Sequence, residues 1–223
     1  MEDARAYEEL RVGFTAAVSH ELRTPLARLL ALLESAELPD ADRDALLAEA
    51  REQVEQMSEL IDDVLFLSEL ESGRQVVALG GTTALPVLEE VRDRLADSAE
   101  RAGVTITIEA APGVELPLRR RMLYVVVENL ASNAVRYAGP DATVTLSAGP
   151  GVLEVADNGR GVEEDELPRL FERFYRSDRA RASRGTGLGL AIVKHVIASA
   201  GGRVEASGGP GRGLRVLCSF PAL

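Results

Sequence analysis

The sequence is poor in the residues that build disulfides and large aromatic surfaces. It has one cysteine, Cys218, and no tryptophan among 223 residues. One cysteine cannot form a disulfide within the chain, and its place in the apolar run at residues 214–220 is typical of a buried strand. No apolar run reaches the roughly 18 residues that a membrane-spanning helix needs, and we find no signal peptide and no repeat. The fold must therefore rest on an ordinary hydrophobic core.

Positive charge is also scarce relative to negative charge. The chain has 25 lysine and arginine residues against 36 aspartate and glutamate residues, a net charge of −11. This surplus repels phosphate backbones and anionic headgroups, so it disfavours nucleic acid or an anionic membrane surface as a partner. The hydrophobic share of 46% is that of a soluble protein, and the length allows one large domain or two small ones.

The N-terminal segment has the pattern of an amphipathic helix. Apolar residues recur at spacings of three and four over residues 14–33, which predicts a helix over about residues 4–35. At about 100° per residue, His20 and Thr24 fall on the face opposite this apolar stripe. Pro25 removes one backbone hydrogen bond and is expected to bend the helix. The pattern therefore places an imidazole and a hydroxyl on the solvent face.

His20 admits other interpretations from its own surroundings. A histidine beside Glu21 on a solvated helix face needs no function at all, and this is the commoner situation. A zinc-protease helix is excluded, because the fourth residue after His20 would have to be a second histidine and is Thr24. His20 is thus a surface residue or a group that reacts with an arriving molecule.

A second helical segment follows a turn at residues 38–40, and Asp40 or Asp42 is expected to cap it. Its apolar residues occupy two heptad positions. Two antiparallel helices cannot bury both stripes alone, so a pair of hairpins forming a four-helix bundle, and hence a homodimer, is predicted. The two stripes consist of Leu47, Val54 and Ile61, and of Ala50, Met57 and Val64.

The heptads stop at residues 72–74, which marks a domain boundary. We therefore divide the chain into a linker helix (1–12), a helical hairpin (13–73) and a second domain (74–223). Periodicity in the second domain predicts helices grouped against a mixed sheet, an α/β sandwich. The predicted strands cover residues 75–79, 104–110, 143–148, 152–157, 203–207 and 214–220, and the predicted helices cover residues 82–102, 118–137 and 188–200.

Polar residues gather on one side of the predicted helix at 118–137. Asn129 and Asn133 are four residues apart and project from one side, joined by Arg136 and Tyr137. Two neutral oxygen ligands on a rigid element suit Mg²⁺ held jointly with phosphates, since this ion keeps its waters and takes few protein ligands. An ordinary polar surface is the alternative.

Two glycine-rich stretches come next in the chain. Asp157, Gly159 and Gly161 follow a predicted strand, where a carboxylate could read a purine amino group or the residues could simply form a turn. The run Gly185-Thr186-Gly187-Leu188-Gly189 opens a predicted helix, and backbone N–H groups at such a start bind phosphate. It matches neither a P-loop nor the dinucleotide spacing. Between the stretches lies a basic segment that suggests a mobile lid over a polyphosphate: Arg169, Arg173, Arg176, Arg179, Arg181 and Arg184.

Taken together, these stretches resemble the sensor histidine kinases of two-component signalling over about residues 10–223. Five motifs occur in that family's order. SHELRTPL at 19–26 looks like its H box, ENLASNAVRYA at 128–138 its N box, DNGRGV at 157–162 its first glycine box, LFERFYR at 170–176 its F box, and GTGLGLAIV at 185–193 its second glycine box. The resemblance implies a dimeric four-helix bundle followed by a Bergerat-type ATP-binding α/β sandwich.

The resemblance also implies an activity and its residues. His20 would be the phosphoacceptor, Glu21 the base that polarises it, and Thr24 the group that positions a water for dephosphorylating a partner. ATP and Mg²⁺ would be the cofactors, with Asn133 on the metal, and Arg176 would reach the γ-phosphate. The implied nucleotide-binding set is Asn129, Asn133, Arg136, Tyr137, Asp157, Gly159, Gly161, Gly185, Thr186, Gly187, Leu188 and Gly189.

The implied partners are a second copy of the chain and the receiver domain of a response regulator. The family usually carries a sensor and a membrane anchor upstream, so we expect the cytoplasmic part of a membrane receptor. Gyrase- and chaperone-type ATPases share the ATP fold, but their general-base glutamate stands where this chain has Asn129, and Glu128 lies about 100° around the helix. A dimeric scaffold that binds ATP without transferring phosphate is the other alternative.

Overall fold

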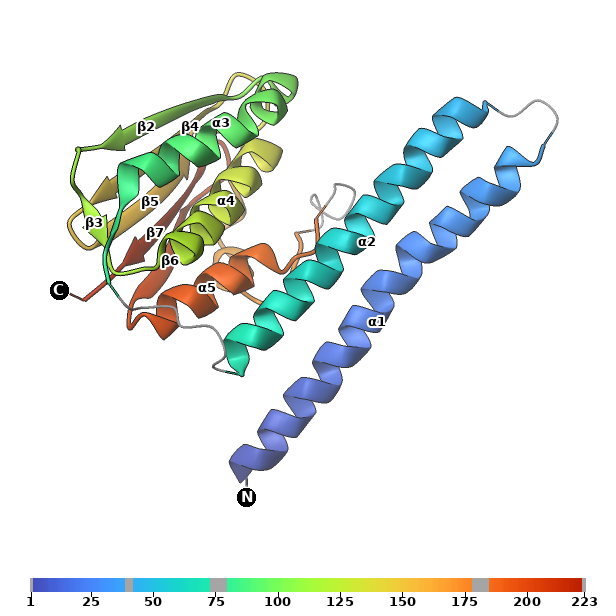
Figure 1. The fold of residues 1–223 in the computed structure, drawn as a ribbon, viewed down its shortest axis with the longest axis horizontal. Coiled ribbons are helices and arrows are strands. Elements are labelled where there is room, and N and C mark those ends of the chain that lie inside the picture. The colour runs from blue at the N-terminus through green and yellow to red at the C-terminus, as the bar shows by residue number, and fades with distance from the viewer. Residues whose placement is uncertain (1, 39–41, 73–79, 178–184, 222–223) are drawn as a thin grey trace.

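The chain folds into a long helical hairpin followed by a globular α/β domain (Figure 1). The computed structural model describes residues 2–38, 42–72, 80–177 and 185–221, with side chains from Thr15 onward. The expected fold class, helices followed by an α/β sandwich, is confirmed. The predicted strand at residues 75–79 and most of the turn at 38–40 lie outside the described residues.

The hairpin consists of α1 (Glu2–Ala36) and α2 (Arg43–Glu71), which pack side by side. α1 continues through Pro25, so the proline removes one hydrogen bond without ending the helix. α2 begins as predicted, because an Asp42 carboxylate oxygen accepts a hydrogen bond from the Ala45 N–H at 3.1 Å. It ends at the predicted boundary, where Ser72 is its C-cap.

Much of the hairpin's apolar surface faces solvent in the single chain. Ala50, in one predicted stripe, is only 8% exposed, whereas the other stripe stays 45–51% exposed at Leu47, Val54 and Ile61. Leu26, Leu30, Leu33, Leu38 and Leu65 are also exposed. An apolar face of this length on two antiparallel helices is what the predicted four-helix bundle would bury.

The globular domain is built on a five-stranded mixed sheet of order β2-β4-β5-β7-β6. β2 runs parallel to β4, and the other neighbours are antiparallel. A separate two-stranded ribbon pairs β1 with β3. The strands are β1 (Thr82–Thr83), β2 (Thr105–Ala110), β3 (Glu115–Leu116), β4 (Thr143–Gly149), β5 (Val152–Asp157), β6 (Arg203–Gly208) and β7 (Leu214–Ser219).

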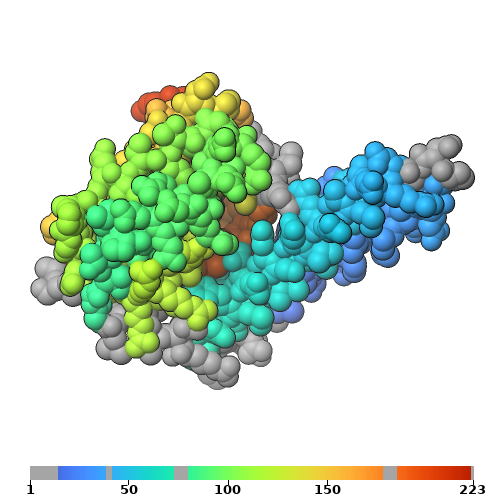
Figure 2. All heavy atoms as spheres, turned by 45° about the horizontal axis from the view of Figure 1, so that its top comes forward, coloured from blue at the N-terminus to red at the C-terminus, as the bar shows by residue number. Residues whose placement is uncertain are grey.

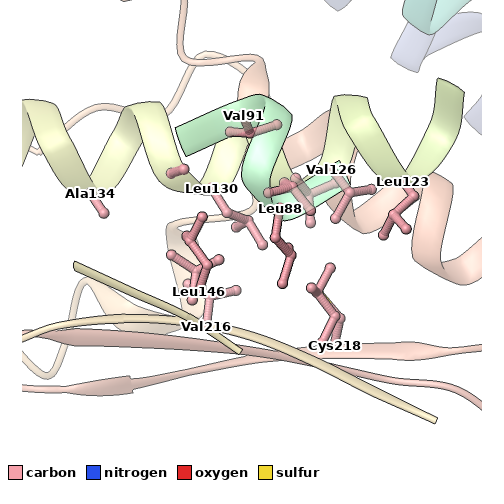
Figure 3. Close-up of a cluster of buried hydrophobic side chains, with 14 of the residues drawn as sticks. Leu88, Val91, Leu123, Val126, Leu130, Ala134, Leu146, Val216 and Cys218 are labelled. Carbon is pink, nitrogen blue, oxygen red and sulfur yellow. The ribbon is translucent and has the colours of Figure 1, made fainter. Parts of the chain in front are cut away.

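Three helices, α3 (Ala84–Ala102), α4 (Arg120–Tyr137) and α5 (Gly189–Ser199), pack with the sheet around one core. Figure 3 shows Leu88 of α3 and Leu130 of α4 pointing toward Leu146 and Val216 of the sheet. Cys218 lies in this core, as predicted, and burial raises the pKa of its thiol to about 12, so it stays protonated and unreactive.

Two helices of the globular domain begin two residues later than predicted. The helix predicted at 82–102 begins at Ala84, because Thr82 and Thr83 pair with β3 instead. The helix predicted at 118–137 begins at Arg120, since the buried Leu118 precedes its first turn. A 3-10 turn, η1 (Leu167–Arg169), lies in the segment between β5 and α5.

The C-terminal half of α2 connects the hairpin to the globular domain by packing against α5. Leu60, Leu67 and Leu70 are at most 5% exposed there. The Arg121 guanidinium lies over the Phe66 ring, 5.9 Å from its centroid. Beyond this contact the hairpin projects away from the domain (Figure 2). Within the described ranges, none of the helices has the length and apolar content to cross a membrane.

Candidate functional site: a cleft between the helical hairpin and the globular domain

A cleft of about 740 Å³ lies between the hairpin and the globular domain. Its walls come from α1, from α2, from the F-box segment and from the start of the second glycine box. They are formed by Glu21, Thr24, Pro25, Arg28, Glu49, Glu52, Gln53, Gln56, Glu59, Leu60, Arg169, Glu172, Arg173, Phe174, Tyr175, Arg176, Gly185 and Thr186. The cleft thus brings H-box residues together with residues 144 to 165 positions later in the chain.

His20 is exposed on α1 and is not itself among the residues that line the cleft. Its neighbour Glu21 is half-buried and lines the cleft, as does Thr24 one turn further along. The Thr24 hydroxyl donates only a long hydrogen bond, 3.5 Å, to the His20 carbonyl oxygen. The imidazole is therefore on the solvent face, as the helical pattern predicts, and its position leaves it accessible to a docking molecule.

The two asparagines of the N box are half-buried on α4. The Asn129 side-chain N–H donates to the Val125 carbonyl oxygen at 2.8 Å, which orients the amide. The amide oxygen then faces the start of α5, so close that a Cβ on Gly189 would lie 2.4 Å from it. A side chain at position 189 would displace the Asn129 amide, and this packing sets the N box against the second glycine box. The opposite face of α4 is core, as predicted: Val126, Val127, Leu130 and Ala134 are buried.

The side-chain oxygens of the N box suit a metal ion whose remaining ligands come from phosphate. Asn129 and Asn133 supply amide oxygens, which Mg²⁺ accepts as ligands. Across the described part of the chain, no group of three or more histidine, cysteine, aspartate or glutamate side chains is positioned to hold a metal. A magnesium ion here would depend on the phosphates of a nucleotide for the rest of its coordination.

The glycine-rich turn before α5 is held by the last turn of α4, by the F box and by burial of its own Leu188. Arg136 and Tyr137, in the last turn of α4, lie beside Gly185. The Phe174 N–H donates to the Gly187 carbonyl oxygen at 2.9 Å, which ties the turn to the F box. Leu188 is fully buried. The structure therefore brings together residues of the N box, the F box and the second glycine box around one turn.

Thr186 in this turn contacts a residue that the sequence did not single out. Its hydroxyl accepts a hydrogen bond from the Leu188 N–H at 3.2 Å and donates to an Asp63 carboxylate oxygen of α2 at 2.7 Å. Burial raises the pKa of Asp63, the bond from Thr186 opposes this shift, and the charges of Glu59 and Asp62 add to it. No sequence signal marks Asp63, because it is one acidic residue among several on α2.

Asp157 stands at the end of β5, half-buried. One of its carboxylate oxygens accepts a hydrogen bond from the Gly159 N–H at 2.9 Å. Burial raises the pKa of Asp157, while the backbone N–H groups of Gly159 and Leu214 oppose the shift. An acceptor group on a rigid strand end, partly shielded from bulk water, can bind an amino group strongly.

The first glycine box packs against protein backbone. Gly161 has φ +66°, and a Cβ on it would lie 2.0 Å from the Gly209 carbonyl oxygen. The Arg160 carbonyl oxygen accepts from the Gly211 N–H at 2.7 Å, and the Gly159 carbonyl oxygen from the Gly213 N–H at 3.1 Å. These glycines are therefore needed for the packing of two loops, and their predicted contact with a nucleotide stays a prediction.

Three of the six arginines in the predicted basic segment are among the described residues. Arg169 lies over the Tyr175 ring at 4.4 Å, Arg173 forms an ion pair with Glu71 of α2, and Arg176 is half-buried in the cleft wall. Arg179, Arg181 and Arg184 lie outside the described residues. The described arginines thus surround the cleft on the side of the globular domain.

Two protein families match the two parts of the chain. Residues 10–73 match the His Kinase A (phospho-acceptor) domain, and residues 119–223 match the histidine kinase-, DNA gyrase B-, and HSP90-like ATPase family. The histidine kinase AdeS of Acinetobacter baumannii superposes with a TM-score of 0.73 at 24% identity, covering 90% of this chain and 97% of that one. At this identity the likeness establishes the fold alone.

Two relatives match nearly the whole chain. The chain is 35% identical to the sensor-like histidine kinase SenX3 of Mycolicibacterium smegmatis and 38% identical to the phosphate regulon sensor protein PhoR of Pseudomonas aeruginosa, each over 96% of its length. It spans 58% and 50% of those two proteins. With both domain types present in this order, and with two relatives that match nearly the whole chain, the chain belongs to the sensor histidine kinases of two-component systems.

Proposed function

We propose that this chain phosphorylates its own His20 from ATP and then passes the phosphoryl group to an aspartate of a response-regulator receiver domain. The observation that carries the proposal is the cleft shared by Glu21 and Thr24 on one side and Arg176, Gly185 and Thr186 on the other. Phosphoryl transfer requires mainly positioning and neutralisation of charge, and the two walls of the cleft offer the acceptor helix and the cationic side chain for it.

For the nucleotide, we assign the adenine to Asp157 and the phosphates to the turn that opens α5. The half-buried Asp157 carboxylate can accept a hydrogen bond from the adenine amino group. Backbone N–H groups at Gly187 and Gly189 stand at a helix N-terminus, where phosphate binds. Mg²⁺ held by Asn133, with Asn129 beside it, would neutralise phosphate charge, and Arg176 would stabilise the γ-phosphate from the cleft wall.

At the acceptor, we assign Glu21 to polarise the His20 imidazole, so that one ring nitrogen is free to attack phosphorus. The new N–P bond forms as the bond between the γ-phosphorus and the ADP oxygen breaks. Since Glu21 is adjacent to His20 and half-buried, its carboxylate can stay close to the ring while the ring itself remains exposed.

We further propose a reverse activity and the assembly in which both activities occur. Thr24 lies one turn beyond His20 and lines the cleft, where its hydroxyl can orient a water toward a partner's acyl phosphate. Residues 13–73 are proposed as the dimerisation and phosphotransfer hairpin, with residues 1–12 as a linker helix, and residues 74–223 as the ATP-binding domain. Because the two relatives above are sensors of about twice this length, we assign signal sensing and membrane attachment to the rest of the protein.

Incubation with Mg²⁺ and ATP labelled at the γ-phosphate tests the proposal. We expect label on the protein; free labelled phosphate alone would instead indicate an ATPase, and neither product a binding scaffold. Asn133→Ala should lower the labelling rate on the order of 100-fold, because the metal loses its ligand. Ser132→Ala, a smaller truncation of a polar side chain at the adjacent, half-buried position of α4, is the control and should label at close to the parental rate.

A further inference from the structure

One partly buried polar contact joins the proposed phosphate-binding turn to the hairpin of the same chain. The Thr186 hydroxyl donates to Asp63 of α2 at 2.7 Å, across 123 positions of sequence. The same hydroxyl accepts the Leu188 N–H, at the last residue before α5. Asp63 is therefore bonded directly to the residue that organises the N-terminus of α5.

Other contacts on α2 hold the globular domain in the same arrangement. Glu71, two turns further along α2, pairs with Arg173, and Phe66 lies under Arg121 of α4. Leu60 and Leu67 are 4% and 1% exposed on the same half of the helix. Asp63 lies between these anchors, so Asp63 belongs to an extended docking surface of α2.

The position of this carboxylate has an electrostatic consequence. The turn around Thr186 is where the triphosphate is proposed to bind, and Asp63 brings a negative charge into hydrogen-bond contact with that turn. Glu59 and Asp62 on α2 raise the local negative potential further. Two anionic groups at one partly buried turn repel each other with little screening from water.

We propose that Asp63 is a positioning residue that docks the glycine-rich turn onto α2 through Thr186, and that its carboxylate and the triphosphate of ATP oppose each other's binding. Docking by Asp63 then lowers the affinity for ATP, and by thermodynamic linkage ATP loosens the docked domain by the same factor. The domain is released from α2 when nucleotide is loaded. This inference rests on the nucleotide site proposed above.

Titration of the full chain with a non-hydrolysable ATP analogue and with adenosine, both in the presence of Mg²⁺, tests whether the Asp63 charge opposes ATP binding. Asp63→Asn keeps an oxygen acceptor for Thr186 and removes the charge, so it should bind the ATP analogue on the order of tenfold more tightly than the parent. Adenosine, which has no phosphates, should bind both proteins equally. Asp44→Asn makes the same change of net charge at an exposed position in the first turn of α2, far from the glycine-rich turn, and should leave the affinity near the parental value.

Hydrogen exchange of the parent and of two Asp63 variants, without nucleotide, tests the docking of the glycine-rich turn onto α2. Asp63→Ala removes the acceptor and should increase exchange at the amides of residues 186–188, whereas Asp63→Asn should leave it unchanged. Equal analogue affinity in parent and Asp63→Asn, or an equal gain for adenosine, would overturn the inference while leaving the nucleotide site intact. A parent that binds no analogue at all would overturn the nucleotide site and this inference with it.

Discussion

Two glycines in neighbouring loops have nearly the same φ angle but very different surroundings. Gly161 has φ +66° and would place a Cβ 2.0 Å from the Gly209 carbonyl oxygen, whereas Gly211 has φ +70° with nothing within 4 Å. Substituting alanine at either position imposes the left-handed conformation on a residue with a side chain, which costs about 1–2 kcal/mol. At Gly161 the methyl group must also move the loop at residues 209–213.

That movement breaks hydrogen bonds that join the two loops. The bonds from Gly211 to Arg160 and from Gly213 to Gly159 are the ones at risk, and each contributes about 1 kcal/mol. Gly161→Ala should therefore destabilise the globular domain by about 3–4 kcal/mol, and Gly211→Ala by about 1–2 kcal/mol.

Scanning calorimetry of the full chain measures the difference. At about 3 °C per kcal/mol, the transition of the globular domain should fall by roughly 10 °C in Gly161→Ala and by about 4 °C in Gly211→Ala. Because φ is matched, the difference between the two variants reports the clash alone. Equal shifts in the two variants would refute the reasoning, since they would mean that the loops accommodate the methyl group without losing their bonds.

Three further changes probe separate parts of the molecule. Burial raises the pKa of Asp157 above the ordinary aspartate value of 3.8, so ionising this carboxyl lowers the stability of the folded state. As the pH rises from 3.8 through the raised pKa, the parent should therefore become progressively less stable relative to Asp157→Asn. Urea unfolding of both proteins at a series of pH values measures this difference. Ile61→Glu, in the exposed stripe of α2, should convert a dimer to a monomer in sedimentation, with the exposed Glu55→Gln as the control that stays dimeric. Thr24→Ala should label itself normally but fail to speed loss of phosphate from the regulator; undiminished dephosphorylation would contradict its role.

The parts of the fold that were predictable are those in which one pattern repeats many times. The stripe over residues 14–33 and the heptads of α2 recur for several turns, so their spacing alone distinguishes helix from strand. The alternation in β4 is equally clear, and its buried and half-buried residues alternate as expected. The order of helices and strands, and with it the fold class, follows from such local regularities.

Contacts between distant segments were not predictable in this way. β1 has two residues, too few to show any alternation, and it forms only because β3 lies beside it. The bond between Asp63 and Thr186 joins two residues that no motif links. Likewise, the motif at Gly159 and Gly161 suggested ligand contact, but only the folded chain reveals the protein backbone that approaches these glycines.

Mapping the phosphorylated residue tests the central claim most directly. After incubation of the full chain with Mg²⁺ and γ-labelled ATP, we predict a label that is labile to acid, stable to base and located on His20, as expected for a phosphoramidate. His20→Gln should carry no label and should still bind ATP, because His20 is on the exposed face of α1 while the nucleotide motifs belong to the globular domain. Label that survives in His20→Gln, or that maps to a serine or threonine, would contradict the account.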